Sequence, residues 1–306
     1  MEPEHRTHTV DPQDGNHNSI PKPPNYDIVI DCALDFTPGL LALASAEQIH
    51  FSSMMMSLGD EEVEISVHST EEQFCKLYER MSEGFVPATS ATTIFAYEKT
   101  FEEIAKQGRD VLCLCLSGQL SSTFGNAVMA GRNLQEKYPQ RKFAVVDSKS
   151  ATAKMTRVVE AAIDHWKEGL SLEENEKRTS AITSLPGFAV IQDLDYLKRS
   201  GRLTATGAFF AKALQVRPMI EILSNGSLTV LVKTRGMKQA YQVLVDKALE
   251  LRGHRKPLVG HCNNLEGALE LKERILTQTP YTEVEISTVN PIIGTHLGPG
   301  AVIMVL

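Results

Sequence analysis

The spacing of apolar positions divides the chain into a polar leading segment and a long remainder that is patterned for folding. Residues 1–25 are polar, contain five prolines and show no periodic apolar positions. Because such a segment cannot bury enough apolar surface to offset the entropy lost on ordering, we predict a disordered tail there. From Tyr26 onward, short apolar runs alternate with segments of helical periodicity.

The first part of the patterned region alternates predicted strands with predicted helices. Apolar runs typical of buried strands lie at 27–30, 111–116 and 143–146. Helical periodicity is found at 71–82, 97–107, 124–137 and 151–167. Because this order requires crossover connections, the sequence predicts a mostly parallel sheet flanked by helices.

The second part contains a hairpin signal. Asn225 and Gly226 lie between two apolar runs, 219–223 and 228–232, and an Asn-Gly pair in that position favours a tight turn between antiparallel strands. Further helical periodicity is found at 238–251 and 264–276. This part is therefore predicted to hold a mixed sheet with an antiparallel component.

Chain length and the change of pattern together predict two domains. A chain of 306 residues is longer than a single hydrophobic core usually reaches. The pattern changes near residues 166–172, so we expect an N-terminal α/β domain over 26–168 and a C-terminal α/β domain over 169–306. The predicted fold class is α/β, with helices flanking the parallel sheet of the first domain.

Charge and composition narrow the classes of partner. The net charge of -7 disfavours binding to nucleic acid or to an anionic membrane surface. No apolar run approaches the ~20 residues of a membrane span, and the first residues lack the pattern of a signal peptide. Five scattered cysteines without a Cys-x-x-Cys pair favour reduced thiols and disfavour a zinc site. We expect a cytoplasmic monomer that needs no metal or other cofactor and does not insert stably into membranes.

Polar side chains follow each of the three predicted strands of the first domain. Asp31, Ser117 and Asp147 occupy these positions. Because sheets of this kind bind ligands beyond the carboxyl ends of their strands, we expect the three side chains near one rim.

Two clusters of hydroxyl side chains lead into predicted helices. Residues 117–123 read Ser-Gly-Gln-Leu-Ser-Ser-Thr, and residues 89–93 read Thr-Ser-Ala-Thr-Thr. Hydroxyls and free backbone N–H groups at a helix N-terminus can bind a carboxylate or a phosphate. The alternative is that these side chains are ordinary helix caps. The candidate ligand-binding hydroxyls are those of Thr89, Ser90, Ser121 and Ser122.

Two further side chains complete the candidate site. Gly201 has the position of a left-handed helix stop, and the guanidinium of Arg202 after it can bind a carboxylate through two hydrogen bonds. A surface salt bridge is the alternative for Arg202. His296 lies in a glycine-rich run, 294–300, which leaves the backbone free to turn sharply and approach a ligand, and an apolar segment typical of a buried strand follows at 301–306.

Common enzyme motifs are absent from the sequence. It contains no phosphate-binding Gly-x-x-x-x-Gly-Lys loop, no Gly-x-Gly-x-x-Gly after the first strand, no His-Glu-x-x-His and no Gly-x-Ser-x-Gly elbow. Ser121, His296 and Asp147 supply the residue types of a hydrolytic triad, although nothing in their spacing supports one. A serine-dependent acyl hydrolase is therefore the alternative to a binding protein.

Several separated segments resemble the DegV family, bacterial proteins that hold one long-chain fatty acid. Residues 89–93 and 117–124 resemble its two hydroxyl loops, and Asp147-Ser148 resembles the end of its next strand. The longest similarity runs over 194–202 and continues at 216–219 and Arg235. His296 stands before the terminal Gly-Pro-Gly, as in the family, and the resemblance extends from residue 27 to 306.

The resemblance implies a carrier rather than an enzyme. Family members hold the carboxylate with hydroxyls that match Thr89 and Ser121 and with a histidine that matches His296. The acyl chain, such as that of palmitate, stearate or oleate, lies in an apolar tunnel between the domains. A separate fatty acid kinase phosphorylates the bound acid for phospholipid metabolism, so a transient kinase partner is implied. Residues 205–214 are a candidate tunnel wall, although an ordinary core explains their apolar side chains equally well.

Overall fold

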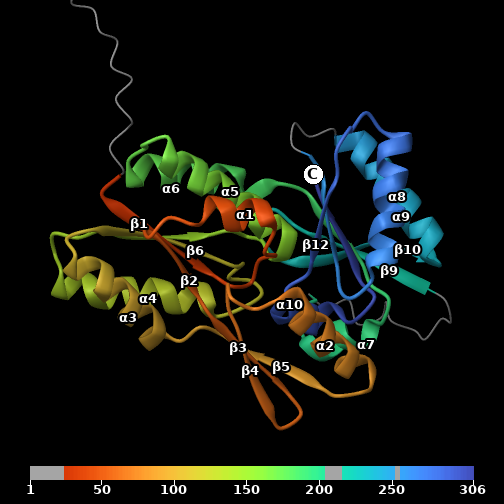
Figure 1. Cartoon of the computed structure of the whole chain (residues 1–306), viewed down its shortest axis with the longest axis horizontal. Coiled ribbons are helices and arrows are strands. Elements are labelled where there is room, and N and C mark those ends of the chain that lie inside the picture. The colour runs from red at the N-terminus through yellow and green to blue at the C-terminus, as the bar shows by residue number, and fades with distance from the viewer. Residues whose placement is uncertain (1–23, 204–215, 252–255) are drawn as a thin grey trace, which may run out of the picture.

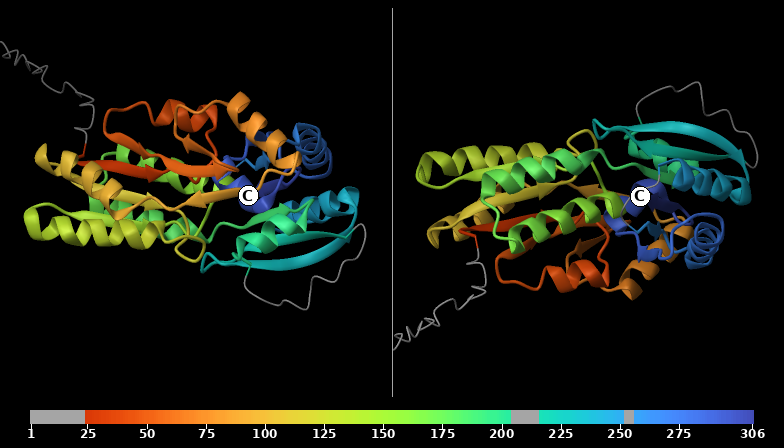
Figure 2. Two further views of the ribbon diagram at one scale, coloured as in Figure 1. Left: turned by 90° about the horizontal axis from the view of Figure 1, so that it is seen from below. Right: turned by 90° about the horizontal axis from the view of Figure 1, so that it is seen from above.

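The computed structural model describes residues 24–203, 216–251 and 256–306. Residues 1–23 of the predicted tail and the candidate tunnel wall at 205–214 lie outside the described residues. Figures 1 and 2 show two main sheets side by side along the long axis, with the C-terminus near their junction.

The first sheet has four parallel strands in the order β2-β1-β6-β7. These strands are β1 (Tyr26–Asp31), β2 (Ile49–Ser52), β6 (Asp110–Cys115) and β7 (Phe143–Asp147). Helices α3 (Ile94–Lys106) and α4 (Thr123–Lys137) cover one face. Helices α1 (Pro38–Leu43), α5 (Thr152–Lys167) and α6 (Leu172–Ala181) lie over the other (Figure 1). Because both faces are covered, the predicted strands β1, β6 and β7 are apolar on both sides, as the uninterrupted runs in the sequence indicated. Strand β2, which reads Ile-His-Phe-Ser, was not predicted.

A small antiparallel sheet of three strands, in the order β4-β3-β5, follows the first parallel strands. Its strands are β3 (Met54–Leu58), β4 (Glu61–Ile65) and β5 (Pro87–Ser90), with helix α2 (Glu71–Ser82) between the last two. The apolar pattern did not predict this sheet, because β4 reads Glu-Glu-Val-Glu-Ile and β5 reads Pro-Ala-Thr-Ser.

The second main sheet has six strands in the order β10-β9-β8-β13-β11-β12, antiparallel except for the pair β11 and β12. Its strands are β8 (Gly187–Val190), β9 (Val216–Ile222), β10 (Leu228–Arg235), β11 (Leu258–His261), β12 (Glu285–Thr288) and β13 (Val302–Val305). Helices α8 (Met237–Leu251) and α9 (Leu265–Gln278) cover one face, and β9 and β10 form the predicted hairpin. The short helices are η1 (Ile182–Ser184), α7 (Leu194–Ser200) and α10 (Pro291–Leu297).

The α/β fold class predicted from the sequence is confirmed by this arrangement. The domain boundary at 168/169 stays a prediction. Helix α6, which begins at Leu172, packs against α5 and β7 and so lies with the first sheet.

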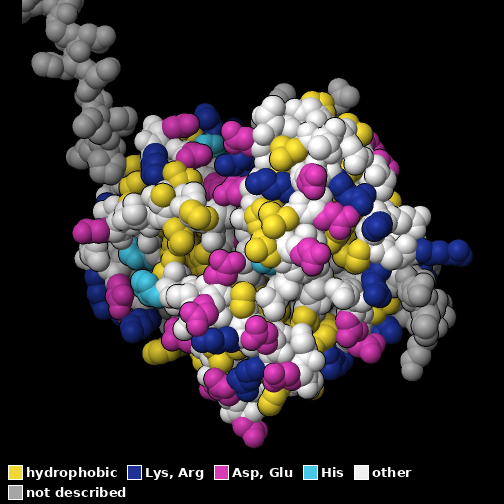
Figure 3. All heavy atoms as spheres, turned by 45° about the vertical axis from the view of Figure 1, so that its right-hand side comes forward, with side chains coloured by type: hydrophobic (Ala, Val, Ile, Leu, Met, Phe, Trp, Pro, Cys, Tyr) yellow, Lys and Arg dark blue, Asp and Glu magenta, His cyan; other side chains and the backbone are white. Residues whose placement is uncertain are grey.

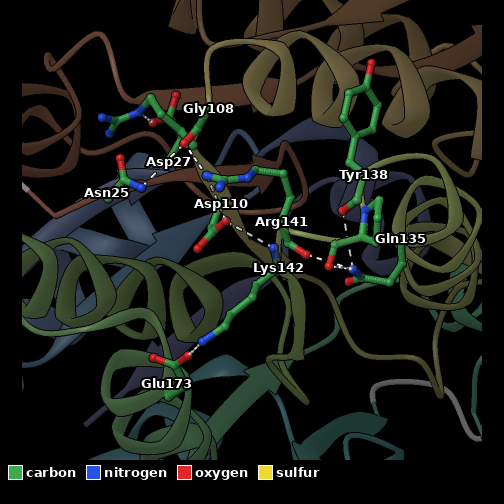
Figure 4. A network of polar contacts seen from close by, with 11 residues as sticks. Asn25, Asp27, Gly108, Asp110, Gln135, Tyr138, Arg141, Lys142 and Glu173 are labelled. Carbon is green, nitrogen blue, oxygen red and sulfur yellow. Dashed lines mark hydrogen bonds and ion pairs between the residues drawn. The ribbon is translucent and has the colours of Figure 1, made fainter.

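A network of polar contacts ties together the edge of the parallel sheet opposite its carboxyl ends (Figure 4). Asp110 at the start of β6 forms an ion pair with Arg141 at 3.6 Å and accepts a hydrogen bond from the backbone N–H of Lys142 at 3.1 Å. The ammonium of Lys142 pairs with Glu173 of α6. These contacts fill the edge of the sheet where β6 begins. We therefore expect a ligand at the opposite edge, beyond the carboxyl ends of the strands.

The surface mixes charges of both signs. On the face drawn in Figure 3, acidic and basic side chains alternate and hydrophobic side chains form small groups. Within the described part of the chain, no helix is both long and apolar enough to cross a membrane.

Candidate functional site

All six side chains predicted as a ligand site line one cavity of about 280 Å³. This volume lies close to the ~300 Å³ lower end of small-molecule pockets in proteins. The six are Thr89, Ser90, Ser121, Ser122, Arg202 and His296. They come from β5, from the start of α4, from the residues after α7 and from α10, so segments more than two hundred residues apart meet here. That these side chains bind a ligand stays a prediction.

The apolar wall of the cavity is the face of the six-stranded sheet that α8 and α9 leave uncovered. On β13, Val302 and Met304 pack under these helices, whereas Ile303 and Val305 point to the cavity. Alternation along a strand produces this division, since successive side chains point to opposite faces. Ala189, Ile220, Ile222, Leu228 and Ile293 add to the apolar wall.

His296 lies in the last turn of helix α10. The sharp change of chain direction that the sequence predicted around this residue is therefore placed wrongly. Asn290 caps the helix by accepting a hydrogen bond from the Ile292 N–H at 3.0 Å, and Pro291 occupies the first turn. The turn comes afterwards, at Gly298 with φ 82°. The histidine is therefore held by a helix rather than by a free loop.

Helix α10 is fastened to the end of the first parallel strand. The carboxylate of Asp35 accepts a hydrogen bond from the Asn290 N–H at 3.2 Å, and the Asn290 amide donates to the Cys32 carbonyl at 2.7 Å. The buried hydroxyl of Tyr78 donates to the Val289 carbonyl at 2.9 Å. These three bonds set the position of α10, and thereby of His296, relative to the N-terminal sheets.

The imidazole of His296 lies within hydrogen-bond distance of Thr89, with 3.2 Å between Nε2 and the threonine Oγ1. Burial, and secondly the charge of Arg202, lowers the pKa of His296 to about 4. The imidazole is therefore neutral at pH 7, and it contacts a ligand through hydrogen bonding rather than charge.

Arg202 supplies a positive charge beside His296. Its Nε donates to the Leu120 carbonyl at 3.3 Å, and Nη1 donates to the carbonyl of Ser200. Among the described residues it forms no ion pair, so the surface salt bridge considered from the sequence is not what the structure has. Gly201 before it adopts the expected left-handed conformation, with φ 66°. The guanidinium retains N–H groups that can bind an anion.

The hydroxyl cluster before α4 does not serve as a helix cap in the ordinary way. Ser122 occupies the cap position, but its side chain makes no capping hydrogen bond. The Ser121 hydroxyl lies 2.9 Å from that of Thr123 and accepts a bond from the Thr123 N–H at 3.3 Å. Among the described residues the Ser122 hydroxyl has no hydrogen-bond partner, and it lies beside the cavity at the N-terminus of this 15-residue helix.

In the other hydroxyl cluster, residues 89–93, one side chain is a helix cap and two line the cavity. Thr93 caps α3 by accepting a bond from the Ala96 N–H at 3.2 Å, as the ordinary alternative has it. Thr89 and Ser90 lie earlier, on strand β5, and line the cavity instead.

The three polar residues that follow the parallel strands do gather at one rim. Asp31 accepts a bond from the Leu116 N–H at 2.7 Å, and Asp147 accepts one from the Gly118 N–H at 3.3 Å. The buried hydroxyl of Ser117 donates to the Gly226 carbonyl at 2.8 Å, which joins this rim to the hairpin of the second sheet. All three side chains bond the backbone, so they hold the rim together.

The geometry gives no support to the hydrolase alternative, which stays a prediction. His296 pairs with Thr89, Ser121 pairs with Thr123, and Asp147 bonds the backbone N–H groups of Gly118 and Lys149. Within the described residues no hydrogen bond joins the serine to the histidine or the histidine to the aspartate, so the relay that a triad requires is not formed.

The sequence analysis missed one charged residue of the cavity. Lys154 of α5 lies in the wall and is only 1% exposed. The helical period placed it in a helix, but nothing in the pattern marked it as facing a cavity. Among the described residues, no cluster of three or more His, Cys, Asp or Glu side chains is arranged to hold a metal ion.

Comparison with known proteins identifies the family of this chain. Residues 25–306 match the family described as uncharacterised protein, DegV family. A DegV domain-containing protein of Clostridium perfringens is 30% identical over 233 residues, which cover 73% of this chain and 78% of that relative.

Solved structures of low sequence identity share the fold. A DegV family protein of Ruminococcus gnavus, refined with vaccenic acid, has a TM-score of 0.80 at 22% identity, covering 92% of this chain and 99% of that one. The Fatty Acid Kinase (Fak) B3 protein of Streptococcus pneumoniae, loaded with linoleic acid, has a TM-score of 0.76 at 22% identity and covers 92% of this chain and 98% of that one. With a family match over nearly the entire chain, this protein belongs to the DegV family.

Proposed function

We propose that this protein binds one long-chain fatty acid in the cavity. The carboxylate lies among the hydroxyls of Thr89, Ser90, Ser121 and Ser122, the imidazole of His296 and the guanidinium of Arg202. The acyl chain lies along the apolar face of the six-stranded sheet. The observation that carries the proposal is the division of a single cavity into a hydroxyl, imidazole and guanidinium end and an apolar wall.

The chemistry of the two parts suits a fatty acid. Each methylene removed from water contributes about 0.8 kcal/mol, so the apolar wall supplies most of the affinity. A neutral imidazole, hydroxyls and one guanidinium bind a carboxylate without a metal or other cofactor. Three solved structures of similar fold support this ligand class: one refined with vaccenic acid, one described as a stearic acid-binding protein and one loaded with linoleic acid.

We further propose that the protein is a carrier in the bacterial cytoplasm, not an enzyme, and that it presents the acid to a fatty acid kinase. Ser90 and Ser122 are exposed at the polar end, so the carboxylate is accessible from outside. A second, polar pocket adjoins this end, lined by Arg199, Arg202 and His296 among others. The likeness to a protein named for fatty acid kinase supports this step.

The test of the proposed function is the ligand that the protein carries. Protein purified from a bacterial host is denatured, and the released lipid is identified by mass spectrometry. We expect about one long-chain fatty acid per chain. Protein that is empty, and that takes up neither palmitate nor oleate, would count decisively against the proposal.

The carrier role has its own test. Protein loaded with palmitate is mixed with a bacterial fatty acid kinase and ATP, and acyl phosphate is trapped with hydroxylamine. We expect trapping to depend on the loaded protein. Equal trapping from free palmitate would remove the presentation step and leave fatty acid binding intact.

A further inference from the structure

The wall of the cavity contains a buried ammonium that fatty acid binding does not require. Lys154 is 1% exposed, and its aliphatic stem covers Gly187 at the start of β8. Among the described residues the ammonium donates one hydrogen bond, to the Lys149 carbonyl at 3.3 Å. An ammonium has three donors, and a buried unpaired donor is costly. Within the described part of the chain this group therefore has fewer acceptors than donors.

No carboxylate neutralises this ammonium among the described residues. Glu221 on β9 is near enough for its charge to favour the protonated form, but the two side chains form no ion pair there. Burial is the larger effect and lowers the pKa of Lys154 to about 8, with the charge of Lys149 acting in the same direction. At pH 7 the group is still mostly charged.

Lys154 lies beside the end of β13 that is farther along the chain from His296. Gly187, which its stem covers, pairs with Val305 at the far end of β13. His296 precedes that strand, which begins at Val302. Val302 and Val305 lie roughly 10 Å apart along the extended strand, so an acyl chain that runs from the carboxylate site along β13 reaches Lys154 beyond its head group.

The backbone just before Lys154, where α5 begins, has an unusual conformation. Thr152, a β-branched residue that lines the cavity, has φ 49°, and Lys149 has φ 48°. Left-handed φ values are rare in such residues and tend to persist where surrounding contacts enforce them. Here the Thr152 N–H donates to the Ala33 carbonyl at 2.8 Å and holds this backbone in place.

We propose that the cavity accepts long-chain acids that carry a second oxygen function along the chain, a hydroxyl or a further carboxylate, and that the Lys154 ammonium binds this oxygen. This inference rests on the proposed fatty acid site and names its substrate class more closely. The oxygen supplies the acceptor that the buried ammonium lacks, and the ammonium offsets the cost of burying that oxygen in an apolar wall.

The experiment compares three acids of one chain length on delipidated protein: stearate, a stearate hydroxylated near mid-chain, and the dicarboxylic acid. Dissociation constants are measured for wild type, for Lys154→Met, which keeps a similar volume, and for Lys167→Met, an exposed lysine on the same helix. We expect the affinity for an oxygenated acid relative to stearate to fall about tenfold or more in Lys154→Met and to stay unchanged in Lys167→Met.

The wild-type protein alone also decides the question if Lys154→Met does not fold. We expect at least one oxygenated acid to bind as tightly as stearate, whereas an apolar wall rejects both by about a hundredfold or more. Stearate binding with rejection of both oxygenated acids, or with relative affinities unchanged in Lys154→Met, overturns this inference alone. Failure to bind any of the three acids overturns the proposed function as well.

Discussion

Replacing Gly294 with alanine tests whether the position of α10 controls the site. A Cβ atom at Gly294 would lie 1.8 Å from the Tyr78 hydroxyl and 2.5 Å from the ring carbon that bears it. Ordinary contacts are ~3.5 to 4.0 Å, so the helix or the ring must move by roughly 1.5 Å. Tyr78 is fully buried and its hydroxyl donates a hydrogen bond to the Val289 carbonyl, so neither the ring nor helix α10 can move without breaking packing contacts.

The expected magnitude follows from these distances. Overpacking of this kind costs about 1 to 3 kcal/mol of unfolding free energy. A shift of α10 by roughly 1.5 Å also takes His296 out of hydrogen-bond reach of Thr89, now at 3.2 Å. Losing the imidazole from a charged carboxylate removes about 1.5 to 3 kcal/mol, so palmitate affinity should fall by tenfold or more.

Two glycine variants separate this effect from general destabilisation. Gly267→Ala is also overpacked, with its Cβ 2.3 Å from the Tyr241 hydroxyl, but it lies in α9 and does not line the cavity. Gly125→Ala, in α4, meets nothing within 4 Å. Urea unfolding and palmitate titration of delipidated proteins should show Gly267→Ala destabilised with normal affinity, and Gly125→Ala stabilised by up to about 1 kcal/mol. Wild-type affinity in Gly294→Ala would refute the reasoning.

Three further predictions concern charge, pH and the contact between the two main sheets. Arg202→Met should weaken palmitate binding about tenfold but leave binding of the matching alcohol unchanged, because only the carboxylate needs the charge; equal losses for both ligands in a titration would contradict this. The His296 imidazole has a pKa of about 4 when folded and 6.5 ordinarily, so the unfolded chain takes up this proton first as pH falls. The ligand-free wild type should therefore lose up to roughly 3 kcal/mol of unfolding free energy between pH 7 and 4 relative to His296→Gln, and parallel pH profiles in urea unfolding would argue against a buried neutral histidine. Gly226→Ala places a Cβ 2.2 Å from the Ser117 hydroxyl, at a residue with φ 88°. Thermal and urea unfolding should therefore show a loss of roughly 2 to 4 kcal/mol of unfolding free energy. An unchanged stability would mean that this contact does not join the two main sheets.

The parts of the fold predicted from the sequence are those with strong local signals. Helix α2 spans the predicted range 71–82, and its capping box between Thr70 and Gln73 marks the start. The hairpin at Asn225 was likewise predicted from its turn. Strands β4 and β5 were missed because they are held by pairing with β3 rather than by their own apolar pattern.

In the candidate site, too, the residue types were predicted from the sequence, whereas their arrangement in space was not. Thr89, Arg202 and His296 were singled out from residue type and resemblance, but their meeting depends on a contact between Asp35 and Asn290 that no local pattern encodes. The histidine was expected on a turn because glycines dominate its surroundings. Asn290 and Pro291 are start signals for a helix, and packing of Gly294 against Tyr78 accounts for a glycine inside it.

A crystal structure of the delipidated protein soaked with palmitate tests the central claim most directly. We predict one carboxylate within hydrogen-bond distance of Thr89 Oγ1 and His296 Nε2, and an acyl chain that runs along Ile303 and Val305. A carboxylate bound elsewhere, or an acyl chain outside this cavity, would contradict the account.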